Sequence, residues 1–451
     1  MLFACFAVAI AGLTVDAFTV PNPRGQQSLA TPRGSAVRRC TLRAARRPNT
    51  APSDDEKSPT AAELSRRQLL DLGLAALTAP ALGGLALASS GRPALAAEAA
   101  VDVKYVLPLA ELLADLASSP PRDVVITGAN SGVGLAGAKL LTAAGHRVLC
   151  ACRTQAKADA AAQACLAFAA SGPATILGIQ APMRPGGTAS GLECDLADLL
   201  SVRSFAAKIK ADKTRKVDTL VLNAGLAMNT GDKEARYTAD GFELTVGTNH
   251  LGHFLLANLL LPELDPNAAV PPRLVITGSP VHDPNSGGGN VGSKATLGDL
   301  SGLEAAVTTK TFDMVDGGAY DPDKAYKDSK LCNLLFMAEA ARRFKGVAVD
   351  AFSPGLIPSP DGFFRYQNKG FAKTFEKISG FAGVSETNDF AGAALAYMAT
   401  EPTLPLPTGG WYDTYPPGKH QLAVHSPSLE AGDPSEQAKL WDLSAKLVGL
   451  A

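Results

Sequence analysis

The chain has 451 residues, of which 46% are hydrophobic and 19% are charged, and its 42 lysines and arginines nearly balance 43 aspartates and glutamates. This composition is typical of a soluble globular protein, and the balanced charge argues against nucleic-acid binding. The seven cysteines are scattered and include no Cys-x-x-Cys pair, so the sequence predicts neither a disulfide framework nor a metal site.

The first hundred residues resemble targeting segments. Residues 1–17 are a short apolar stretch similar to a secretory signal peptide, and residues 18–60 begin with an arginine-rich, acid-free stretch similar to a plastid transit peptide. Residues 61–97 carry twin arginines, an apolar run and an Ala-x-Ala site, as in a twin-arginine thylakoid signal; an Ala/Leu-rich linker is the alternative. These segments predict a plastid protein associated with thylakoids, and they leave residues 120–451 for a single domain.

The first folding signal is the stretch "DVVITGANSGVGLAGAKLL", in which a β-favouring run leads into a glycine cluster and then into a helical pattern. Gly128, Gly132 and Gly134 form the pattern TGxxxGxG. Glycines in such a turn let the backbone approach a pyrophosphate at the N-terminus of the following helix. We therefore predict a dinucleotide site here, with Asn130 and Ser131 in the same turn.

The next predicted strand, "HRVLCACR", ends in Arg153, nineteen residues beyond Gly134. A site that prefers NAD carries an acidic residue near this point, whereas a guanidinium pairs with the 2′-phosphate of NADP. The sequence therefore predicts NADPH as the cofactor. Lys157 lies one helical turn further on, where it either adds a second positive charge to this site or is an ordinary solvated lysine.

Further short apolar strands alternate with helical stretches, a pattern that predicts an α/β fold with a Rossmann-type, doubly wound parallel sheet in a single domain. Ligands bind such sheets at the carboxyl ends of the strands. The residues predicted at these ends are Asp195, Leu196, Asn223, Ala224, Gly225, Ser279, Pro354 and Gly355.

The stretch "AYKDSKLCN" contains a candidate proton donor, Tyr326. Tyrosine ionises near pH 10, so acid or base chemistry near neutrality needs a neighbouring cation and a hydrogen-bond donor. Lys330 lies one helical turn later on the same face and would supply the cation. Ser279 would bond to the substrate or to the phenol, and Asn249 would hold a water that links the lysine to solvent.

Together, TGxxxGxG, Asn-Ala-Gly, a serine at a strand end, Tyr-x-x-x-Lys and a later Pro-Gly resemble the short-chain dehydrogenase/reductase family from Asp123 to Gly355. The resemblance implies an NADPH-binding reductase domain over residues 120–451. It also implies a catalytic tetrad, and it gives Tyr326 and Lys330 a second role as cofactor contacts. The four tetrad residues are Asn249, Ser279, Tyr326 and Lys330.

Longer strings resemble one branch of that family, the light-dependent protochlorophyllide oxidoreductases: "ARYTADGFELTVGTNHLGHFLLANLLLPEL", "LGDLSGL", "AYKDSKLCN" and "KLWDLSAKLVGLA". The implied reaction is the light-driven, NADPH-dependent reduction of the C17–C18 double bond of protochlorophyllide, a tetrapyrrole pigment, with Tyr326 as proton donor. The branch carries a cysteine beside its substrate, which here is Cys332; a buried structural thiol is the alternative.

The sequence departs from that branch in the loop "FSPGLIPSPDG", where Leu356 replaces a cysteine and two extra prolines occur. Ser359 in this loop is expected to bind the carboxamide of the cofactor. The divergence leaves open two alternative functions. One is a dark reductase or dehydrogenase of the same family acting on another pigment or an isoprenoid, and the other is a pigment-binding scaffold without turnover.

Two later segments are open to more than one interpretation. In "GGWYDTYPPGKHQLAVHSPS" the aromatic residues form either a wall for a flat ligand or the packed edge of the last strand, which we favour. In "GFFRYQNKGFAKTFEKISGFAG" phenylalanines alternate with lysines, which suits a lipid interface or a pigment lid, or else a helix that faces the core. Peripheral thylakoid association and a homo-oligomer are both compatible with the sequence.

Overall fold

The structure is a computed structural model that describes residues 103–451 except 265–269, 359–365, 368, 402–403 and 405–407. The three predicted targeting segments, residues 1–97, lie outside the described residues, and so does Ser359. No helix in the described part has both the length and the apolar character that crossing a bilayer requires.

A nine-stranded sheet forms the centre of the fold, in the order β1-β11-β10-β9-β8-β7-β2-β3-β6. Seven of its strands are mutually parallel: β2 (Asp123–Thr127), β3 (Arg147–Cys152), β6 (Thr188–Glu193), β7 (Thr219–Leu222), β8 (Arg273–Thr277), β9 (Ala348–Phe352) and β10 (Trp411–Asp413). The chain builds β2, β3 and β6 outward and then returns to place β7 on the other side of β2, which creates a switch point for ligand binding. The predicted doubly wound parallel sheet is therefore confirmed.

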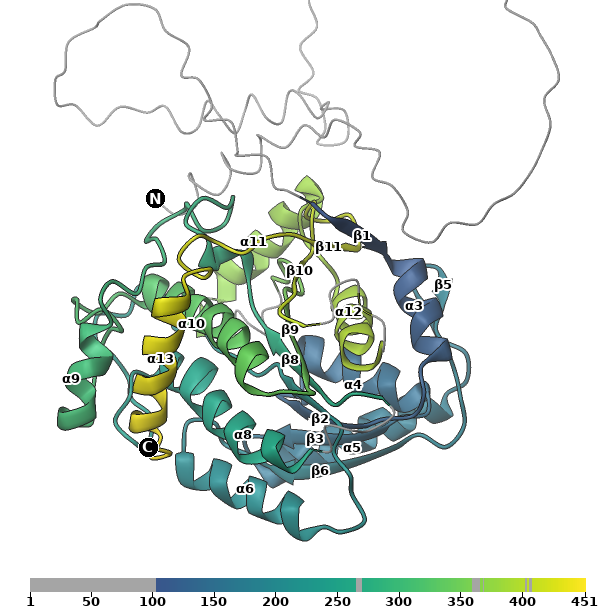
Figure 1. Cartoon of the computed structure of the whole chain (residues 1–451). Coiled ribbons are helices and arrows are strands. Elements are labelled where there is room, and N and C mark those ends of the chain that lie inside the picture. Colours follow the sequence, from purple (N-terminus) through teal and green to yellow (C-terminus); the bar gives the residue numbers. More distant parts are fainter. Residues whose placement is uncertain (1–102, 265–269, 359–365, 368, 402–403, 405–407) are drawn as a thin grey trace, which may run out of the picture. The chain divides into compact units, whose positions relative to one another are not determined.

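Helices cover both faces of the sheet (Figure 1). The face with α3 (Leu109–Ser118), α4 (Gly132–Ala143), α5 (Gln155–Ala170) and α12 (Asn388–Thr400) has one hydrophobic core. The face with α6 (Leu199–Ala211), α8 (Gly252–Leu260), α10 (Pro322–Arg343) and α13 (Pro434–Leu447) has the other. Successive strand residues alternate between the two cores, as Val124 and Val125 do, because side chains of a strand point to opposite faces.

The folded part begins earlier than the predicted boundary at residue 120. Strand β1 (Tyr105–Pro108) pairs antiparallel with β11 (Gln421–Val424), which itself pairs antiparallel with β10. Leu112 and Leu116 lie one turn apart on α3 and are fully buried. The N-terminal strand and helix therefore belong to the domain, because β1 covers the sheet edge that β11 would otherwise expose and α3 packs into the core on one face of the sheet.

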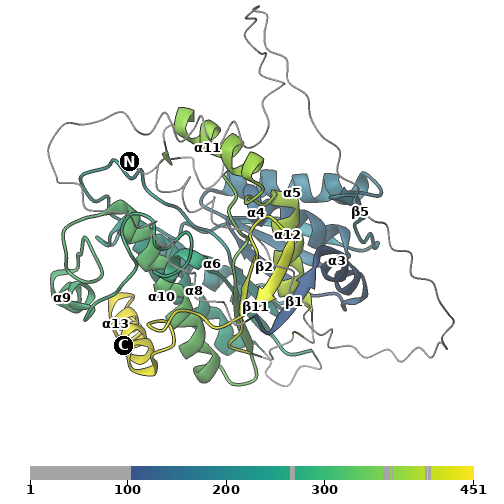
Figure 2. The ribbon, with the colours of Figure 1, turned by 90° about the horizontal axis from the view of Figure 1, so that it is seen from above.

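The remaining elements are short or peripheral. They are β4 (Thr175–Ile176), β5 (Ile179–Gln180), α7 (Leu244–Val246), the π-helix η1 (Gly247–Leu251), the 3₁₀ helices η2 (Leu261–Glu263) and η3 (Pro280–His282), α9 (Ser301–Thr309) and α11 (Lys369–Ala382). In the view from above, α11 lies at the periphery of the molecule (Figure 2).

Candidate active site

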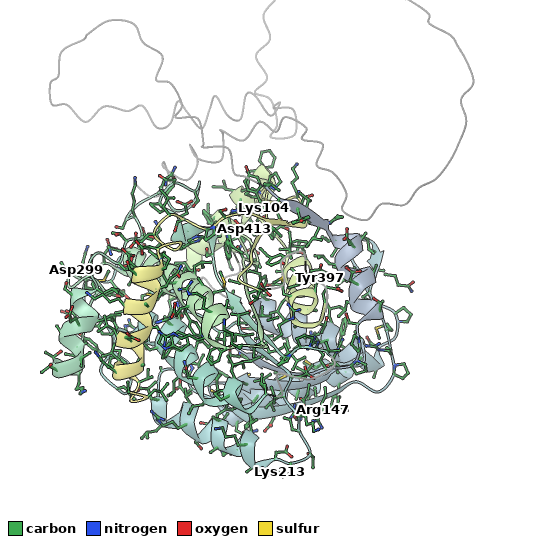
Figure 3. The ribbon with its side chains drawn as sticks, viewed as in Figure 1. Lys104, Arg147, Lys213, Asp299, Tyr397 and Asp413 are labelled. Atoms are coloured by element: carbon green, nitrogen blue, oxygen red, sulfur yellow. The ribbon has the colours of Figure 1, made fainter. Side chains whose placement is uncertain are left out.

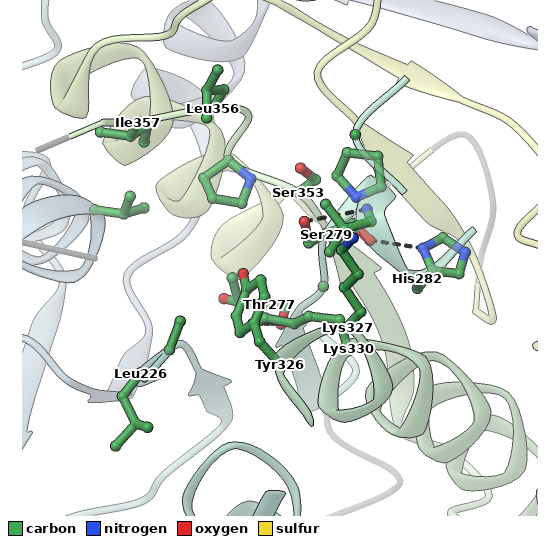
Figure 4. A pocket seen from close by; sticks show the side chains of 18 of the residues that line it. Leu226, Thr277, Ser279, His282, Tyr326, Lys327, Lys330, Ser353, Leu356 and Ile357 are labelled. Atoms are coloured by element: carbon green, nitrogen blue, oxygen red, sulfur yellow. Dashed lines mark hydrogen bonds between the residues drawn. The ribbon is translucent and has the colours of Figure 1, made fainter. Parts of the chain in front are cut away.

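A cavity of about 930 Å³ lies at the carboxyl ends of the parallel strands. Its wall includes the glycine-rich turn after β2, the ends of β3, β6 and β7, and the loops after β8, β9, β10 and β11. In Figure 4, Tyr326 and Lys330 project from α10 toward this space, and Ser279 and His282 lie on the neighbouring part of the wall. The predicted strand-end residues are therefore brought together in one site.

The glycine-rich turn has no space for side chains at two of its glycines. Gly128 has a φ of +68°, and a Cβ atom there would lie 2.9 Å from the Cα atom of Ala224. A Cβ atom on Gly134 would lie 2.5 Å from the carbonyl oxygen of Gly128. Asn130 and Ser131 line the cavity between these glycines. The bare backbone at the start of α4 fits a pyrophosphate group, which supports the predicted dinucleotide site.

Thr127 joins this turn to the Asn-Ala-Gly turn after β7. Its hydroxyl oxygen accepts hydrogen bonds from the backbone N–H groups of Asn223 (2.9 Å) and Ala224 (3.0 Å). His253 Nδ1 donates to the carbonyl oxygen of Asn249 at 3.0 Å, so its Nε2 accepts from the Thr127 hydroxyl at 2.9 Å. Sequence reasoning did not single out Thr127, although its position next to Gly128 was an available signal.

The other predicted cofactor contacts lie along the same wall. Arg153 and Lys157 line the cavity and are exposed, so a 2′-phosphate would reach Arg153 without burying its charge. Asp195 and Leu196 follow β6, and an Asp195 carboxylate oxygen accepts from the backbone N–H of Ala197 at 3.0 Å. The two interpretations of Lys157 both remain open, because an exposed lysine on the rim satisfies either.

Tyr326 and Lys330 lie one turn apart on α10, as predicted. The Lys330 ammonium nitrogen is 5.7 Å from the centre of the Tyr326 ring and donates to the carbonyl oxygen of Thr277 at 3.0 Å. Burial lowers the pKa of Lys330 to about 8. Burial also raises the pKa of Tyr326 above its ordinary value, and a hydrogen bond with Ser279 opposes this rise only in part. The phenol is thus kept protonated near neutrality, which is the state that a proton donor requires.

Asn249 lies beside the site and does not line the cavity. It sits in the π-helix η1, and its carboxamide bonds in both directions with the backbone of Leu226, with both distances 2.9 Å. The Asn249 amide also donates to the Ser329 hydroxyl on α10 at 3.0 Å. Asn249 therefore holds the turn after β7 against the helix that carries Tyr326. The sequence had predicted a different role, in which Asn249 holds a water.

Cys332 lies away from the cavity. Its side chain is fully buried in the hydrophobic core on the α10 face of the sheet, and burial raises the pKa of its thiol. The physical reason is the helical period, because two residues beyond Lys330 correspond to a rotation of about 200° around the helix. This placement fits the alternative of a structural thiol better than a direct role beside the substrate.

The Pro-Gly loop after β9 lines the cavity through Pro354, Gly355 and Leu356. Gly355 has a φ of +82°, and a Cβ atom there would lie 2.6 Å from Glu386 Cγ and from Thr414 Oγ1. The loop is therefore packed tightly against the segment that follows β10.

A cluster of polar and aromatic residues from the segment "GGWYDTYPPGKHQLAVHSPS" contributes to the cavity wall. Trp411 and Asp413 on β10 (Asp413 is labelled in Figure 3) and His425 after β11 all line the cavity. His425 Nε2 lies 3.5 Å from an Asp413 carboxylate oxygen. Burial lowers the pKa of His425, but the interaction with Asp413 outweighs it, so the pKa is raised overall. Trp411 and Tyr412 are packed in the two hydrophobic cores, as the favoured interpretation holds, but β11 and β1 lie beyond β10, so its edge position was wrong. Trp411 lines the cavity as well, as the alternative of a ligand wall predicts.

The helix α11, for which the sequence left several roles open, contributes to the rim of the cavity. Phe375 is buried and lines the cavity, whereas Ile378 lines it and is 41% exposed. Phe381 is 66% exposed, and Lys373 and Lys377 are exposed as well. Among the described residues, no three His, Cys, Asp or Glu side chains are grouped so that they would hold a metal ion.

The fold and this constellation define a short-chain dehydrogenase. Residues 122–289 match the family model described as short chain dehydrogenase. A crystal structure of an uncharacterized protein from Mycobacterium Paratuberculosis is 29% identical, covers 74% of this chain and 97% of its own, and superposes with a TM-score of 0.51.

Two relatives show to which branch of the short-chain dehydrogenases the chain belongs. The chain is 40% identical over 343 residues to the chloroplastic protochlorophyllide reductase of Chlamydomonas reinhardtii, covering 74% of this chain and 80% of the relative. It is 40% identical over 336 residues to that of Cucumis sativus, covering 73% and 78%. The chain therefore belongs to the protochlorophyllide reductase family, and the predicted resemblance is confirmed.

Proposed function

We propose that the protein catalyses the light-driven, NADPH-dependent reduction of the C17–C18 double bond of protochlorophyllide to give chlorophyllide. The observation that carries the proposal is the arrangement of Tyr326, Lys330 and Ser279 opposite the glycine-rich turn in one cavity of about 930 Å³. The chloroplastic protochlorophyllide reductases at 40% identity support it.

The roles of the residues follow from their environments. Bound NADPH would supply a hydride to C17, and the pigment itself would absorb the light. Tyr326 donates its hydroxyl proton to C18, so that the double bond gains one hydride and one proton. Lys330 and Ser279 stabilise the resulting phenolate through charge and a hydrogen bond, until solvent returns the proton. Arg153 binds the 2′-phosphate, and the glycine-rich turn binds the pyrophosphate.

We further propose that the protein works in the plastid, at the surface of the thylakoid. The relatives are named chloroplastic, and residues 1–97 have the composition of targeting segments. The exposed Phe381 and Ile378 on α11, with Lys373 and Lys377 beside them in sequence, suit an interface with anionic lipids. Binding of the purified protein to vesicles with and without anionic lipid tests this part, and loss of binding in Phe381→Ser is the expected result.

The experiment that tests the reaction uses purified protein mixed with protochlorophyllide and NADPH in darkness, with absorption spectra taken before and after a light flash. Conversion to the red-shifted chlorophyllide band only after light supports the proposal. Conversion in darkness would instead support the dark-reductase alternative that the divergent Pro-Gly loop motivates. Bound pigment without conversion under either condition would support a scaffold.

A substitution separates the enzyme from the scaffold more sharply. Tyr326→Phe removes only the phenolic hydroxyl, so the flash yield of chlorophyllide should fall by about 10²-fold or more while pigment and NADPH still bind. Tyr237→Phe is the matched control, because Tyr237 is 48% exposed and its hydroxyl bonds to Asp313 outside the cavity. Equal yields from Tyr326→Phe and the wild type would refute Tyr326 as proton donor.

A further inference from the structure

The imidazole of His282 bridges two neighbouring segments of the cavity wall, the turn after β8 and the segment after β11. Its Nδ1 lies 2.7 Å from the backbone carbonyl oxygen of Ser279, to which it is joined in Figure 4, and its Nε2 lies 3.2 Å from the backbone N–H of Ser428. A carbonyl can only accept and an amide N–H can only donate, so the proton is on Nδ1 and the lone pair is on Nε2. These two bonds are satisfied together only by the neutral ring in this tautomer.

The ring is also held rigidly by packing. His282 is 1% exposed, and its ring meets the indole of Trp411 edge to face with centroids 5.2 Å apart. Trp411 in turn occupies the space beside Gly278, where a Cβ atom would lie 2.5 Å from the indole. Gly278 is therefore held by the indole of Trp411, and the Ser279 carbonyl is held by the imidazole of His282.

The position of Ser279 matters because its hydroxyl bonds to Tyr326. Ser279 begins the turn of η3, and the distance from its hydroxyl oxygen to the backbone N–H of Val281 is 3.5 Å, the longest that a hydrogen bond reaches. This weak contact cannot by itself hold the serine in place. Other bonds also hold the turn, among them the bond from the Gly278 N–H to the Phe352 carbonyl (2.8 Å) and the bond from the Ser286 hydroxyl to the Pro280 carbonyl (2.7 Å). The 2.7 Å bond from His282 acts on the Ser279 carbonyl itself and, through Ser428, joins it to the segment after β11.

We propose that His282 is a positioning residue for proton transfer, which holds the Ser279 hydroxyl against Tyr326 by tying the Ser279 backbone to the Ser426–Leu429 segment. The inference rests on the proposed function, since it assigns a residue that acts on the proton donor through Ser279. Neither the Tyr-x-x-x-Lys pattern nor the glycine-rich pattern includes His282, which lies in η3 after β8.

The bridge is expected to depend on pH. Burial lowers the pKa of His282, and the bond to the Ser279 carbonyl only partly opposes this. Of the charged groups around the ring, Asp283 and Asp413 favour the protonated form and His425 disfavours it. A protonated ring would direct an Nε2–H group against the N–H of Ser428, so acid should release the bridge.

The test compares His282→Phe with His282→Asn. Phenylalanine keeps a ring against Trp411 but cannot form either hydrogen bond, whereas the asparagine amide can still donate to the Ser279 carbonyl. We expect His282→Phe to slow chlorophyllide formation after the flash by about tenfold with the dissociation constants of NADPH and pigment unchanged within about twofold, and His282→Asn to recover part of the rate. Because acid releases the bridge, the rate of the wild type should fall at low pH, and this fall should be absent in His282→Phe.

A double-mutant cycle with Ser279→Ala shows whether His282 acts through the serine. If it does, His282→Phe has no further effect on the rate in the Ser279→Ala background. His146→Phe is the matched control, because His146 is equally buried and bonds to the backbone of Arg122 away from the cavity. It should lower the melting temperature without changing the rate after the flash.

The outcomes are distinguishable. A wild-type protein that fails to convert protochlorophyllide refutes the proposed function, and this inference with it. An active wild type with an unchanged His282→Phe rate, or with additive effects of His282→Phe and Ser279→Ala, overturns the inference alone. A rate loss in His282→Phe that is matched by weaker NADPH binding and is not restored by His282→Asn also overturns it, because it would reflect general loss of structure.

Discussion

The two halves of the cavity are built in different ways. The half that receives the nucleotide, from β2, β3, β6 and β7, is shaped mainly by backbone: Gly128 and Gly134 leave no space for a Cβ atom, and Thr127 bonds to main-chain N–H groups. The half that faces the substrate is shaped by side chains from distant segments. His282 reaches Ser428 across 146 residues, and Gln367 donates to the carbonyl of Met228 across 139 residues.

This difference explains why the sequence predicts the nucleotide half of the cavity more completely than the other half. A backbone cradle needs particular residues within one turn, so a short contiguous pattern specifies it. A wall made of long-range side-chain contacts can be built from many residue combinations, provided that size and hydrogen bonding match. We therefore expect substitutions in the first half to affect cofactor binding strongly, and those in the second to change rate and pH dependence.

The largest effect should come from Gly134→Ala. Its Cβ atom would lie 2.5 Å from a backbone oxygen of the same turn, so the cradle must shift. We expect NADPH affinity, measured by fluorescence titration, to fall by about 100-fold, equivalent to about 2.7 kcal/mol. Gly186→Ala is the control: Gly186 has a φ of +95° but no heavy atom within 4 Å of the added Cβ, so it should leave NADPH binding unchanged.

The second effect concerns cofactor choice. Arg153→Ala should weaken NADPH binding by about tenfold or more and leave NADH binding nearly unchanged, because only NADPH carries the 2′-phosphate. Lys157→Ala decides between the two interpretations of that lysine. A smaller loss specific to NADPH assigns it to the phosphate site, and no loss makes it a solvated helix residue. An equal loss of both cofactors in Arg153→Ala would contradict the assignment.

The third effect is a pH dependence of the rate. Since burial lowers the pKa of Lys330 to about 8, its charge is lost as the pH rises above that value, and the Tyr326 phenol becomes a weaker acid. The rate of chlorophyllide formation after a flash should therefore fall above about pH 8. The Lys330→Met variant should form chlorophyllide slowly at every pH, and its rate should show no further fall above about pH 8. Because Lys330 is also a predicted cofactor contact, the rate is measured at NADPH concentrations that saturate the protein at both pH 7 and pH 9. A rate that stays constant to pH 10 would count against the role of Lys330.

The smallest effect is on stability and has opposite signs for two histidines, His146 away from the cavity and His425 on the wall of its second half. Burial lowers the pKa of His146 to about 3, so below pH 6.5 the unfolded chain binds a proton that the folded chain does not. The free energy of unfolding should fall by about 1.4 kcal/mol per pH unit below this point for this histidine, and His146→Asn should flatten the slope. The pKa of His425 is raised, so its contribution is present below pH 6.5 and is lost as the pH rises.

Urea unfolding at pH 5, 6, 7 and 9 checks both signs. His425→Asn should be less stable than the wild type at pH 6 and comparable to it at pH 9. The deficit of His146→Asn, which loses the bond from the Arg122 N–H, should be largest at pH 9 and should shrink toward pH 5. A His425→Asn variant with the same deficit at every pH would show that its contact with Asp413 is not a charge interaction.

Patterns within the sequence were enough to predict the parallel doubly wound sheet, the glycine-rich turn, the family, and the one-turn spacing of Tyr326 and Lys330. These features depend on local periodicity and on contiguous patterns, which a chain carries in its own order. The sequence also predicted a strand end at Ser279 and an arginine at the end of β3, because strand ends follow from where apolar runs stop.

The surroundings of those residues depend on how the elements pack together. The helical period directs Cys332 away from Lys330, but packing put that side of α10 into the hydrophobic core, and packing also turned Asn249 toward Leu226 instead of the cavity. The tertiary structure added β1 and α3 to the sheet, and it joined His282 to Ser428 and Asp413 to His425. Each of these contacts joins residues far apart in the chain, so their geometry is fixed only once the sheet order and the two hydrophobic cores are formed.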